Sequence, residues 1–234
     1  MTINKRLIII YIYILIRKIV YLIMTFRKLK GPIIDKGDAT KFLVIFLHGW
    51  GSDGNDLIQI ANSWERKLDN ITFISPDGPE TCPGNPLGKQ WFDILSNNDE
   101  LILKGIDDAY LDLKNFINIQ LEKYSLSPDK YFLVGFSQGT MLAIYTSLRE
   151  KLLGVVGYSG AFIGKKSEQN LFKNDYILLH GKADTIVPIE KMHDAIQKLE
   201  GIANNIENRI YDNLEHSINE EGLQEGLNFI KKRI

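Results

Sequence analysis

Tyr131-Phe132-Leu133-Val134-Gly135-Phe136-Ser137-Gln138-Gly139-Thr140-Met141 is the stretch that decides the fold of this 234-residue chain. Its apolar beginning is typical of a short buried strand, and a helix-like pattern follows Gly139 at once. Between the two stands a G-x-S-x-G pattern, which is typical of a sharp turn from strand to helix. The glycines lack Cβ atoms, so strand and helix can pack closely around that turn. We therefore expect the Ser137 hydroxyl to stand clear of a sheet, as a nucleophile requires.

The composition is that of an ordinary globular protein with one domain. Hydrophobic residues make up 44% of the chain and aromatic residues 10%, which suffices for one sizeable α/β core. The net charge is −1 at pH 7, so no general basic field is available to hold nucleic acid. Cys82 is the single cysteine, which excludes an intramolecular disulfide and fits a reducing compartment. We interpret this cysteine as incidental.

Residues 1–24 form an apolar extension that differs from the rest of the chain. Its apolar run is interrupted at mid-span by Arg17 and Lys18. A signal peptide would show a small-residue cleavage site, which is not visible, and a transmembrane anchor would not carry two charges near its middle. We favour an over-extended start or a disposable tail, with membrane contact through residues 1–23 as the second interpretation.

Residues 25–234 are expected to form the functional domain. Without residues 1–23 the chain has 24 basic and 29 acidic residues, a net charge of −5. That balance is typical of a soluble acidic domain, which we expect in the cytoplasm as a monomer or a homodimer. Association with a membrane through residues 1–23 is the alternative.

Apolar runs and helix-like spacings alternate along this domain. Strands are expected at residues 41–47, 71–74, 131–134, 153–159, 175–179 and 206–211. Helices are expected at residues 57–68, 103–124, 138–151, 189–199 and 223–230. The alternation predicts an α/β fold with a mainly parallel sheet, helices on both of its faces and no large cap domain. Asp107, Asp108 and Asp112 are expected on a solvated helix face.

A glycine-rich turn follows the first long strand, at His48-Gly49-Trp50-Gly51-Ser52-Asp53-Gly54. Its glycines do not spell a phosphate-binding pattern. In α/β hydrolases one oxyanion donor comes from such an H-G loop and the other from the residue after the nucleophile. The backbone N–H groups of Trp50 and Gln138 are therefore the candidate oxyanion hole, and His48 is expected to orient the loop.

A serine hydroxyl needs a base to become nucleophilic, and the base is normally a histidine. The chain has four histidines. His48 precedes Ser137, His180 comes too early to follow its own acid, and His193 falls within an expected helix. His216 alone follows the last expected strand, so it is the candidate base.

Asp184 is the candidate acid because it follows the strand expected at 175–179. In α/β hydrolases the chain order is serine, acid, histidine, and each residue lies at the carboxyl end of a strand. Asp212 is the main rival, being close in sequence to His216. Asp175 begins its strand and so belongs to the wrong edge of the sheet.

Residues 75–93 form a long loop, and loops of this length are often functional. Its aromatic pair, Trp91 and Phe92, would suit a wall of an acyl pocket, although a place in the core is about as well supported. Phe162, in an irregular segment after a strand, is a further candidate for the pocket. The residues that line the pocket stay open at this point.

Several motifs in order resemble the phospholipase/carboxylesterase family of α/β hydrolases, which includes acyl-protein thioesterases and small bacterial carboxylesterases. The resemblance covers roughly residues 29–233. It is carried by Leu47-His48-Gly49-Trp50-Gly51-Ser52-Asp53-Gly54, Pro76-Asp77-Gly78-Pro79, Trp91-Phe92-Asp93, Gly135-Phe136-Ser137-Gln138-Gly139, His180-Gly181-x-x-Asp184-x-x-Val187-Pro188 and His216.

The resemblance implies a serine hydrolase without cofactor or metal. It implies Ser137 as nucleophile, Asp184 as acid and His216 as base, with the N–H groups of Trp50 and Gln138 as oxyanion hole. Members of the family commonly carry a smaller aliphatic residue where Trp50 stands, so the pocket here is expected to be narrowed.

The expected reaction is hydrolysis of carboxylic esters through an acyl-enzyme on Ser137. The substrate would be a small-molecule ester or acyl thioester. An acyl-protein thioesterase or lysophospholipase acting on longer acyl chains is the alternative within the enzyme class. A domain that binds an apolar small ligand without turnover is the hypothesis outside the enzyme class. A peptidase of the same fold is a third hypothesis.

Overall fold

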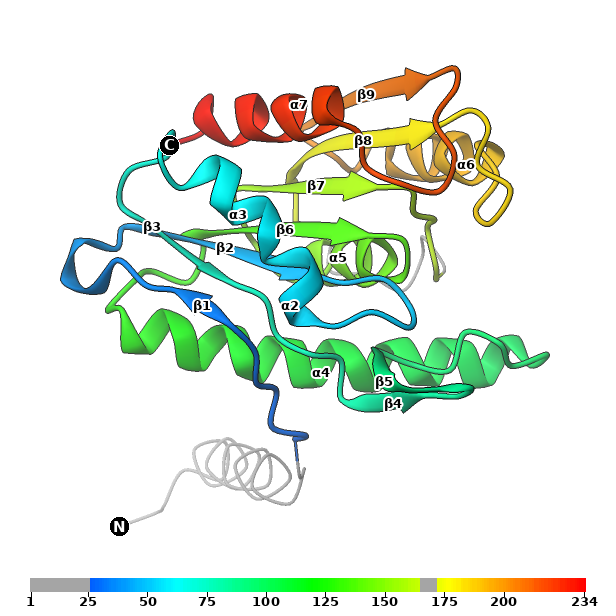
Figure 1. Ribbon diagram of the computed structural model, residues 1–234, viewed down its shortest axis with the longest axis horizontal. Coiled ribbons are helices and arrows are strands. Elements are labelled where there is room, and N and C mark those ends of the chain that lie inside the picture. The colour runs from blue at the N-terminus through cyan, green and yellow to red at the C-terminus, as the bar shows by residue number, and fades with distance from the viewer. Residues whose placement is uncertain (1–25, 165–171) are drawn as a thin grey trace, which may run out of the picture.

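A seven-stranded sheet forms the centre of the computed structural model, which describes residues 26–164 and 172–234 (Figure 1). The predicted extension, residues 1–24, lies outside the described residues. The strands, in their order across the sheet, are β1 (Ile33–Ile34), β3 (Ile71–Ile74), β2 (Phe42–Leu47), β6 (Tyr131–Phe136), β7 (Gly154–Tyr158), β8 (Asp175–Gly181) and β9 (Asn205–Tyr211). All neighbouring pairs are parallel except β1 with β3. The predicted α/β fold is confirmed.

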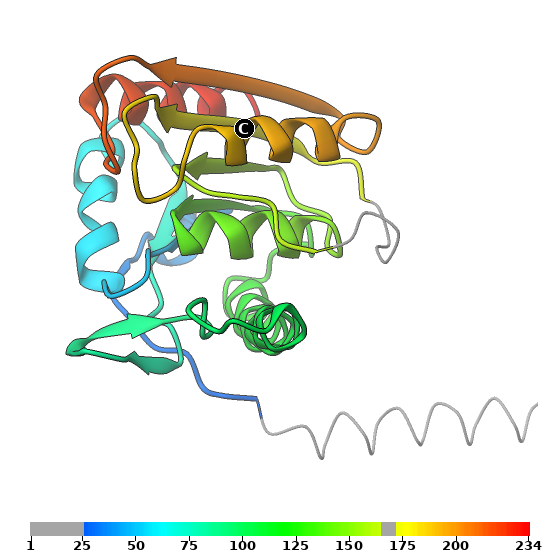
Figure 2. The same cartoon turned by 90° about the vertical axis from the view of Figure 1, so that its right-hand side faces the viewer.

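Helices cover both faces of this sheet (Figure 2). One face carries α4 (Asp99–Lys123), α5 (Gln138–Ser147) and α6 (Glu190–Leu199), and the other carries α2 (Gly54–Leu57), α3 (Gln59–Trp64) and α7 (Glu220–Lys231). Successive residues of a strand point to opposite faces, so Leu133 joins the first apolar cluster and Val134 the second. Because helices cover both faces of the sheet, residues pointing to either face must be apolar, and the central strands are therefore uninterrupted apolar runs in the sequence.

Several elements differ from the sequence expectation. The expected helix at 57–68 is two short helices, α2 and α3, and η1 (Gly37–Ala39) is a single 3₁₀ turn. The expected irregular loop at 75–93 contains a hairpin of β4 (Glu80–Cys82) and β5 (Asn85–Gln90). The long helix α4 begins four residues early, because the Asn98 side chain accepts a hydrogen bond from the Glu100 N–H and caps it.

The acidic face expected on α4 is only partly solvated. Asp108 pairs with Lys104 on the exposed side of the helix. Asp112 is buried instead, and its carboxylate accepts hydrogen bonds from the backbone N–H and from the guanidinium of Arg27. Asp112 is buried because the segment before β1 packs over it, and the spacing of residues along the helix cannot predict such a long-range contact.

The junction of β6 and α5 needs both glycines of the G-x-S-x-G pattern. A Cβ atom on Gly139 would lie 1.8 Å from the carbonyl oxygen of Leu47, at the end of β2. A Cβ atom on Gly135 would lie 2.4 Å from the backbone nitrogen of Thr140. Neither approach is possible for a side chain, so α5 can begin directly over the ends of β2 and β6 only with glycine at both positions.

Candidate active site

Ser137 lies at the tight turn between β6 and α5. Its backbone has φ 52° and ψ −114°, a left-handed conformation that costs a non-glycine residue about 1–3 kcal/mol. Two hydrogen bonds hold this conformation. The Ser137 N–H donates to the carbonyl of Tyr158 at 2.9 Å, and the Ser137 carbonyl accepts from Met141 N–H at 3.2 Å. The half-buried side chain consequently points away from the sheet, into a cavity.

Asp184 and His216 form a close pair at the same edge of the sheet. The two residues follow β8 and β9, and His216 Nδ1 lies 2.7 Å from Asp184 Oδ2. The other carboxylate oxygen accepts from the N–H groups of Ile186 and Val187, at 2.9 and 2.8 Å. Burial alone would raise the pKa of Asp184. The hydrogen bonds from His216 and from the two N–H groups outweigh burial, so the pKa lies below its ordinary value.

The His216 imidazole lies beside the nucleophile turn. Its ring centre is 4.9 Å from that of Phe136, the residue before Ser137, and its side chain is 18% exposed. Within the described residues, no hydrogen bond joins the Ser137 hydroxyl to this imidazole. Catalytic hydrogen bonds are often long in free enzymes and shorten when substrate binds. The structure thus brings His216 and Asp184 into contact and packs His216 against Phe136, the residue before Ser137.

The rival acids have other partners. Asp212 is exposed, and its carboxylate lies 3.2 Å from the Lys182 ammonium. Asp175 lies at the start of β8 and pairs with Arg233 at 2.7 Å. The geometry therefore pairs His216 with Asp184, as strand-end placement predicts.

Two other histidines hold loops of the site together. His48 is fully buried, with Nε2 accepting from the Gly78 N–H and Nδ1 donating to the Gly49 carbonyl, both at 2.8 Å. His180 Nε2 donates to the carbonyl of Val187 at 2.7 Å. Burial lowers the pKa of both imidazoles below its ordinary value, so both are neutral at pH 7. This arrangement fits the expectation that His48 orients its loop.

The loop at Gly49 and Trp50 lies directly against the nucleophile. A Cβ atom on Gly49 would be 3.4 Å from Ser137 Cβ. On the other side, Gln138 is the first residue of α5, at the positive end of the helix dipole. Among the hydrogen bonds of the described residues, none uses the backbone N–H of Trp50 or of Gln138. Both residues line the cavity beside Ser137, and neither backbone N–H has a protein acceptor within the described residues.

A largely apolar cavity of about 420 Å³ opens beside Ser137. It is lined by Trp50, Ile94, Leu95, Ser137, Gln138, Met141, Ala161, Ile186, Val187, Pro188 and Lys191. A second cavity of similar volume shares Ile94, Met141, Ala161 and Lys191 with it, and is lined further by Asp99, Ile102, Leu103, Phe162, Ile163, Gly164, Asp194 and Lys198.

The pocket wall differs from the sequence expectation. Trp91 and Phe92 are fully buried in the apolar core, and the cavity lining among the described residues has Ile94 and Leu95 in their place. The Trp91 indole donates to the carbonyl of His48 at 2.9 Å, which keeps that ring beneath the site. Phe162 lines the second cavity and not the one beside the serine. Burial in the core and exposure in a pocket select the same residue types, so sequence cannot separate them.

A metal site and a membrane-spanning helix are both absent from residues 26–164 and 172–234. Within these ranges no three His, Cys, Asp or Glu side chains gather in a way that could hold a metal ion. Within the same ranges no helix is long and apolar enough to cross a membrane.

A mostly parallel sheet, a strained serine over its central strand and a neighbouring Asp–His pair together define an α/β hydrolase. Residues 30–234 match the phospholipase/carboxylesterase family. The chain belongs to that family and is a hydrolase.

Named relatives support this placement. The chain is 30% identical over 210 residues to acyl-protein thioesterase 1 of Saccharomyces cerevisiae, a match that covers 82% of this chain and 92% of the relative. It is 29% identical over 211 residues to acyl-protein thioesterase 1 of Gibberella zeae, covering 82% and 90% of the two chains. Among solved structures, the crystal structure of esterase PE8 is 32% identical with a TM-score of 0.80, covering 88% of this chain and all of the other.

The neutral buried histidines predict a loss of stability in acid. An unfolded chain protonates His48 and His180 near their ordinary pKa of 6.5, whereas burial lowers the pKa of both in the folded protein. Below about pH 6.5 the unfolded state therefore binds more protons, and each histidine lowers the free energy of unfolding by up to about 1.4 kcal/mol per pH unit. We expect the Tm, followed by differential scanning fluorimetry, to fall between pH 7 and pH 5.5.

Two variants check the origin of this pH dependence. His48→Asn keeps a donor near the Gly49 carbonyl and should flatten the Tm profile. His193→Gln, at an exposed position of α6, should leave the profile unchanged. A Tm that stays constant over this range would contradict the neutral state of both buried imidazoles.

Proposed function

We propose that the chain hydrolyses carboxylic esters through an acyl-enzyme on Ser137. The observation that carries the proposal is the strained serine at the head of α5, beside the His216–Asp184 pair and facing an apolar cavity. Catalytic turns of this kind expose a hydroxyl to substrate and place a helix N-terminus beneath the developing charge. The second supporting observation is that the backbone N–H groups of Trp50 and Gln138 donate to no acceptor among the described residues.

In the first half-reaction Ser137 Oγ attacks the carbonyl carbon of the ester while His216 Nε2 takes its proton. The carbonyl oxygen becomes an oxyanion and accepts hydrogen bonds from the N–H groups of Trp50 and Gln138. The tetrahedral intermediate then collapses, and the C–O bond to the leaving group breaks. The leaving alcohol takes the proton from His216, and the acyl group stays on Ser137.

In the second half-reaction water attacks the acyl carbon and His216 takes a proton from it. The second tetrahedral intermediate collapses to a carboxylic acid, and Ser137 Oγ recovers its proton from His216. Asp184 accepts from His216 Nδ1–H throughout, which fixes the tautomer and stabilises the imidazolium. The lowered pKa of Asp184 keeps this carboxylate charged at neutral pH.

The cavity favours an apolar acyl group of a small-molecule ester or thioester. Longer acyl chains are a second candidate, because the cavity beside Ser137 shares four lining residues with the next one. The relatives named acyl-protein thioesterase fit that candidate. We place the reaction in residues 25–234 and in the cytoplasm, since a single cysteine fits a reducing compartment.

The test is hydrolysis of p-nitrophenyl esters from acetate to palmitate, together with labelling by a fluorophosphonate. We expect turnover of at least the short esters, and mass spectrometry should locate the fluorophosphonate on Ser137. A folded protein that hydrolyses no ester of any length and takes up no label would instead support a ligand-binding domain. Amide turnover comparable to ester turnover would support a peptidase.

Bulk at the boundary between the two cavities should shorten the preferred acyl chain. Ala161 lines both cavities, so a phenyl ring there would take up space along the wall that they share. In Ala161→Phe we expect acetate hydrolysis within about twofold of wild type and a loss of about tenfold or more for palmitate. Tenfold corresponds to roughly 1.4 kcal/mol, less than the burial of two methylene groups. The control is Ala39→Phe, at an exposed position of η1, which should change neither rate. An equal loss of acetate and palmitate hydrolysis in Ala161→Phe would argue against an acyl path shared by the two cavities.

A further inference from the structure

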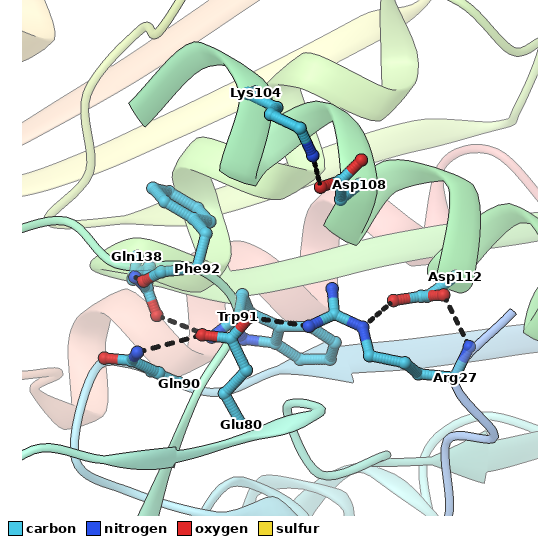
Figure 3. A network of polar contacts seen from close by, with 9 residues as sticks. All are labelled: Arg27, Glu80, Gln90, Trp91, Phe92, Lys104, Asp108, Asp112 and Gln138. Atoms are coloured by element: carbon cyan, nitrogen blue, oxygen red, sulfur yellow. Dashed lines mark hydrogen bonds and ion pairs between the residues drawn. The ribbon is translucent and has the colours of Figure 1, made fainter. Parts of the chain in front are cut away.

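Three consecutive residues, Gln90 to Phe92, tie the two candidate oxyanion loops together. Figure 3 shows them beside Gln138, which belongs to one of these loops. We call residues 90–92 the bridging segment. The Gln138 side chain accepts from the Trp91 N–H at 3.0 Å and donates to the Phe92 carbonyl at 2.8 Å. On the other loop, the Trp50 indole N–H donates to Gln90 Oε1 at 2.9 Å. Both residues that offer an open N–H to the oxyanion are thus fastened by their side chains to one segment.

The Gln90 amide can bind in only one orientation. Its Nε2 donates to Glu80 Oε2 at 3.0 Å, and its Oε1 accepts from the Trp50 indole. An ionised carboxylate only accepts and an indole only donates, so a flipped amide would lose both hydrogen bonds. Gln90 is 4% exposed, which leaves water little access to replace them.

Glu80 is itself held by the segment before β1. Its Oε1 lies 2.6 Å from Arg27 Nη1, and Arg27 Nε lies 2.6 Å from the buried carboxylate of Asp112 on α4. Figure 3 shows Arg27 between the two carboxylates. Charged partners make these bonds stronger than neutral ones, so the amide of Gln90 is linked through Glu80 and Arg27 to the buried carboxylate of Asp112.

The Trp50 side chain adds an anchor to a loop whose backbone is already held. The Gly49 carbonyl, which shares a peptide plane with the Trp50 N–H, accepts from His48 Nδ1 at 2.8 Å and from the Ser52 N–H at 3.3 Å. The bond from the Trp50 indole to Gln90 holds the same residue from its side chain. An oxyanion donor is effective only when its direction is fixed before the charge develops.

We propose that Gln90 is a positioning residue for the oxyanion hole. Through the Trp50 indole it fixes the direction of the Trp50 backbone N–H relative to that of Gln138. The oxyanion then meets two donors whose separation is set by the bridging segment. This inference rests on the proposed function, because it requires an oxyanion to form beside Ser137.

The test compares Gln90→Leu, Trp50→Phe and the double variant of the full chain. For p-nitrophenyl acetate we expect each to lower kcat about tenfold with KM within about twofold, a smaller loss than the 10²–10³ that follows removal of a whole oxyanion donor. The Ki of a butyl trifluoromethyl ketone, whose serine adduct carries an alkoxide, should rise by the same factor. The double variant should lose no more than either single one, because all three break the same hydrogen bond.

A matched control separates positioning from general loss of stability. Tyr176→Phe removes a buried hydrogen bond of 2.9 Å to Ser147, at the start of β8 and away from the serine. It should lower the Tm while kcat and Ki stay at wild-type values. Wild-type kcat and Ki in Gln90→Leu and Trp50→Phe, or additive losses in the double variant, would overturn the inference. Fluorophosphonate labelling of Ser137 in the wild type separates failure of this inference from failure of the proposed function. If Ser137 is labelled and the variants are unchanged, only the role of Gln90 is overturned. If Ser137 is not labelled, the proposed function fails as well.

Discussion

Replacement of Ser137 by alanine is expected to lower ester turnover by about 10⁴-fold or more. The hydroxyl oxygen is the atom that forms the acyl bond, and no neighbouring group can take its place in the proposed reaction. The fold should survive, because alanine retains the Cβ atom and the same strained backbone, and the lost hydroxyl has no hydrogen bond to another described residue. The measurement is kcat with p-nitrophenyl acetate, with the Tm recorded on the same sample.

Ser159 offers a matched control for that variant. It also has a left-handed backbone, with φ 48°, and it follows the neighbouring strand β7. Its buried hydroxyl has no hydrogen-bond partner among the described residues, so Ser159→Ala should keep kcat within about threefold. A Ser137→Ala enzyme that retains more than a tenth of the wild-type rate would rule out Ser137 as the nucleophile.

Replacement of Asp184 by asparagine is expected to lower kcat by roughly 10³–10⁴-fold. The carboxylate accepts from His216 Nδ1–H, which leaves Nε2 free to take the serine proton. An asparagine can turn its NH₂ group toward His216, which favours the opposite tautomer and removes the negative charge that stabilises the imidazolium. The rate should be measured between pH 6 and pH 9, since a loss at every pH separates this effect from a shifted optimum.

Asp212→Asn tests the rival assignment under the same conditions. Asp212 is exposed, and its ion pair with Lys182 contributes little to stability. We expect its kcat to stay within about twofold of wild type. A greater loss in Asp212→Asn than in Asp184→Asn would move the role of acid to Asp212.

The fold could be predicted because its main signals are local. The apolar run at Tyr131 and the glycines around Ser137 indicate a strand, a turn and a helix, and β6 and α5 occupy those residues. Strand β1 has two residues and the β4–β5 hairpin carries mostly polar ones, so neither has the apolar run by which a buried strand is recognised.

The surroundings of the nucleophile could be predicted only in part. Chain order and strand ends lead to Asp184 and His216, and the structure brings these two into contact. No comparable rule predicts the bridging segment, because its bonds to His48, Trp50 and Gln138 join residues that are 40 or more positions apart in the sequence. Tertiary contacts of this length leave no period in the sequence. The aromatic ring of Trp91 therefore gave no sign of whether it faces substrate or core.

Both edges of the seven-stranded sheet are poor templates for aggregation. At one edge β1 is only two residues long and follows Pro32, which has no N–H to offer to another strand. At the other edge β9 carries Glu207 and Arg209, and a strand added there would have to strip water from their charges. Concentrated samples, and partly unfolded ones that keep this sheet, should therefore resist the edge-to-edge stacking that starts fibrils.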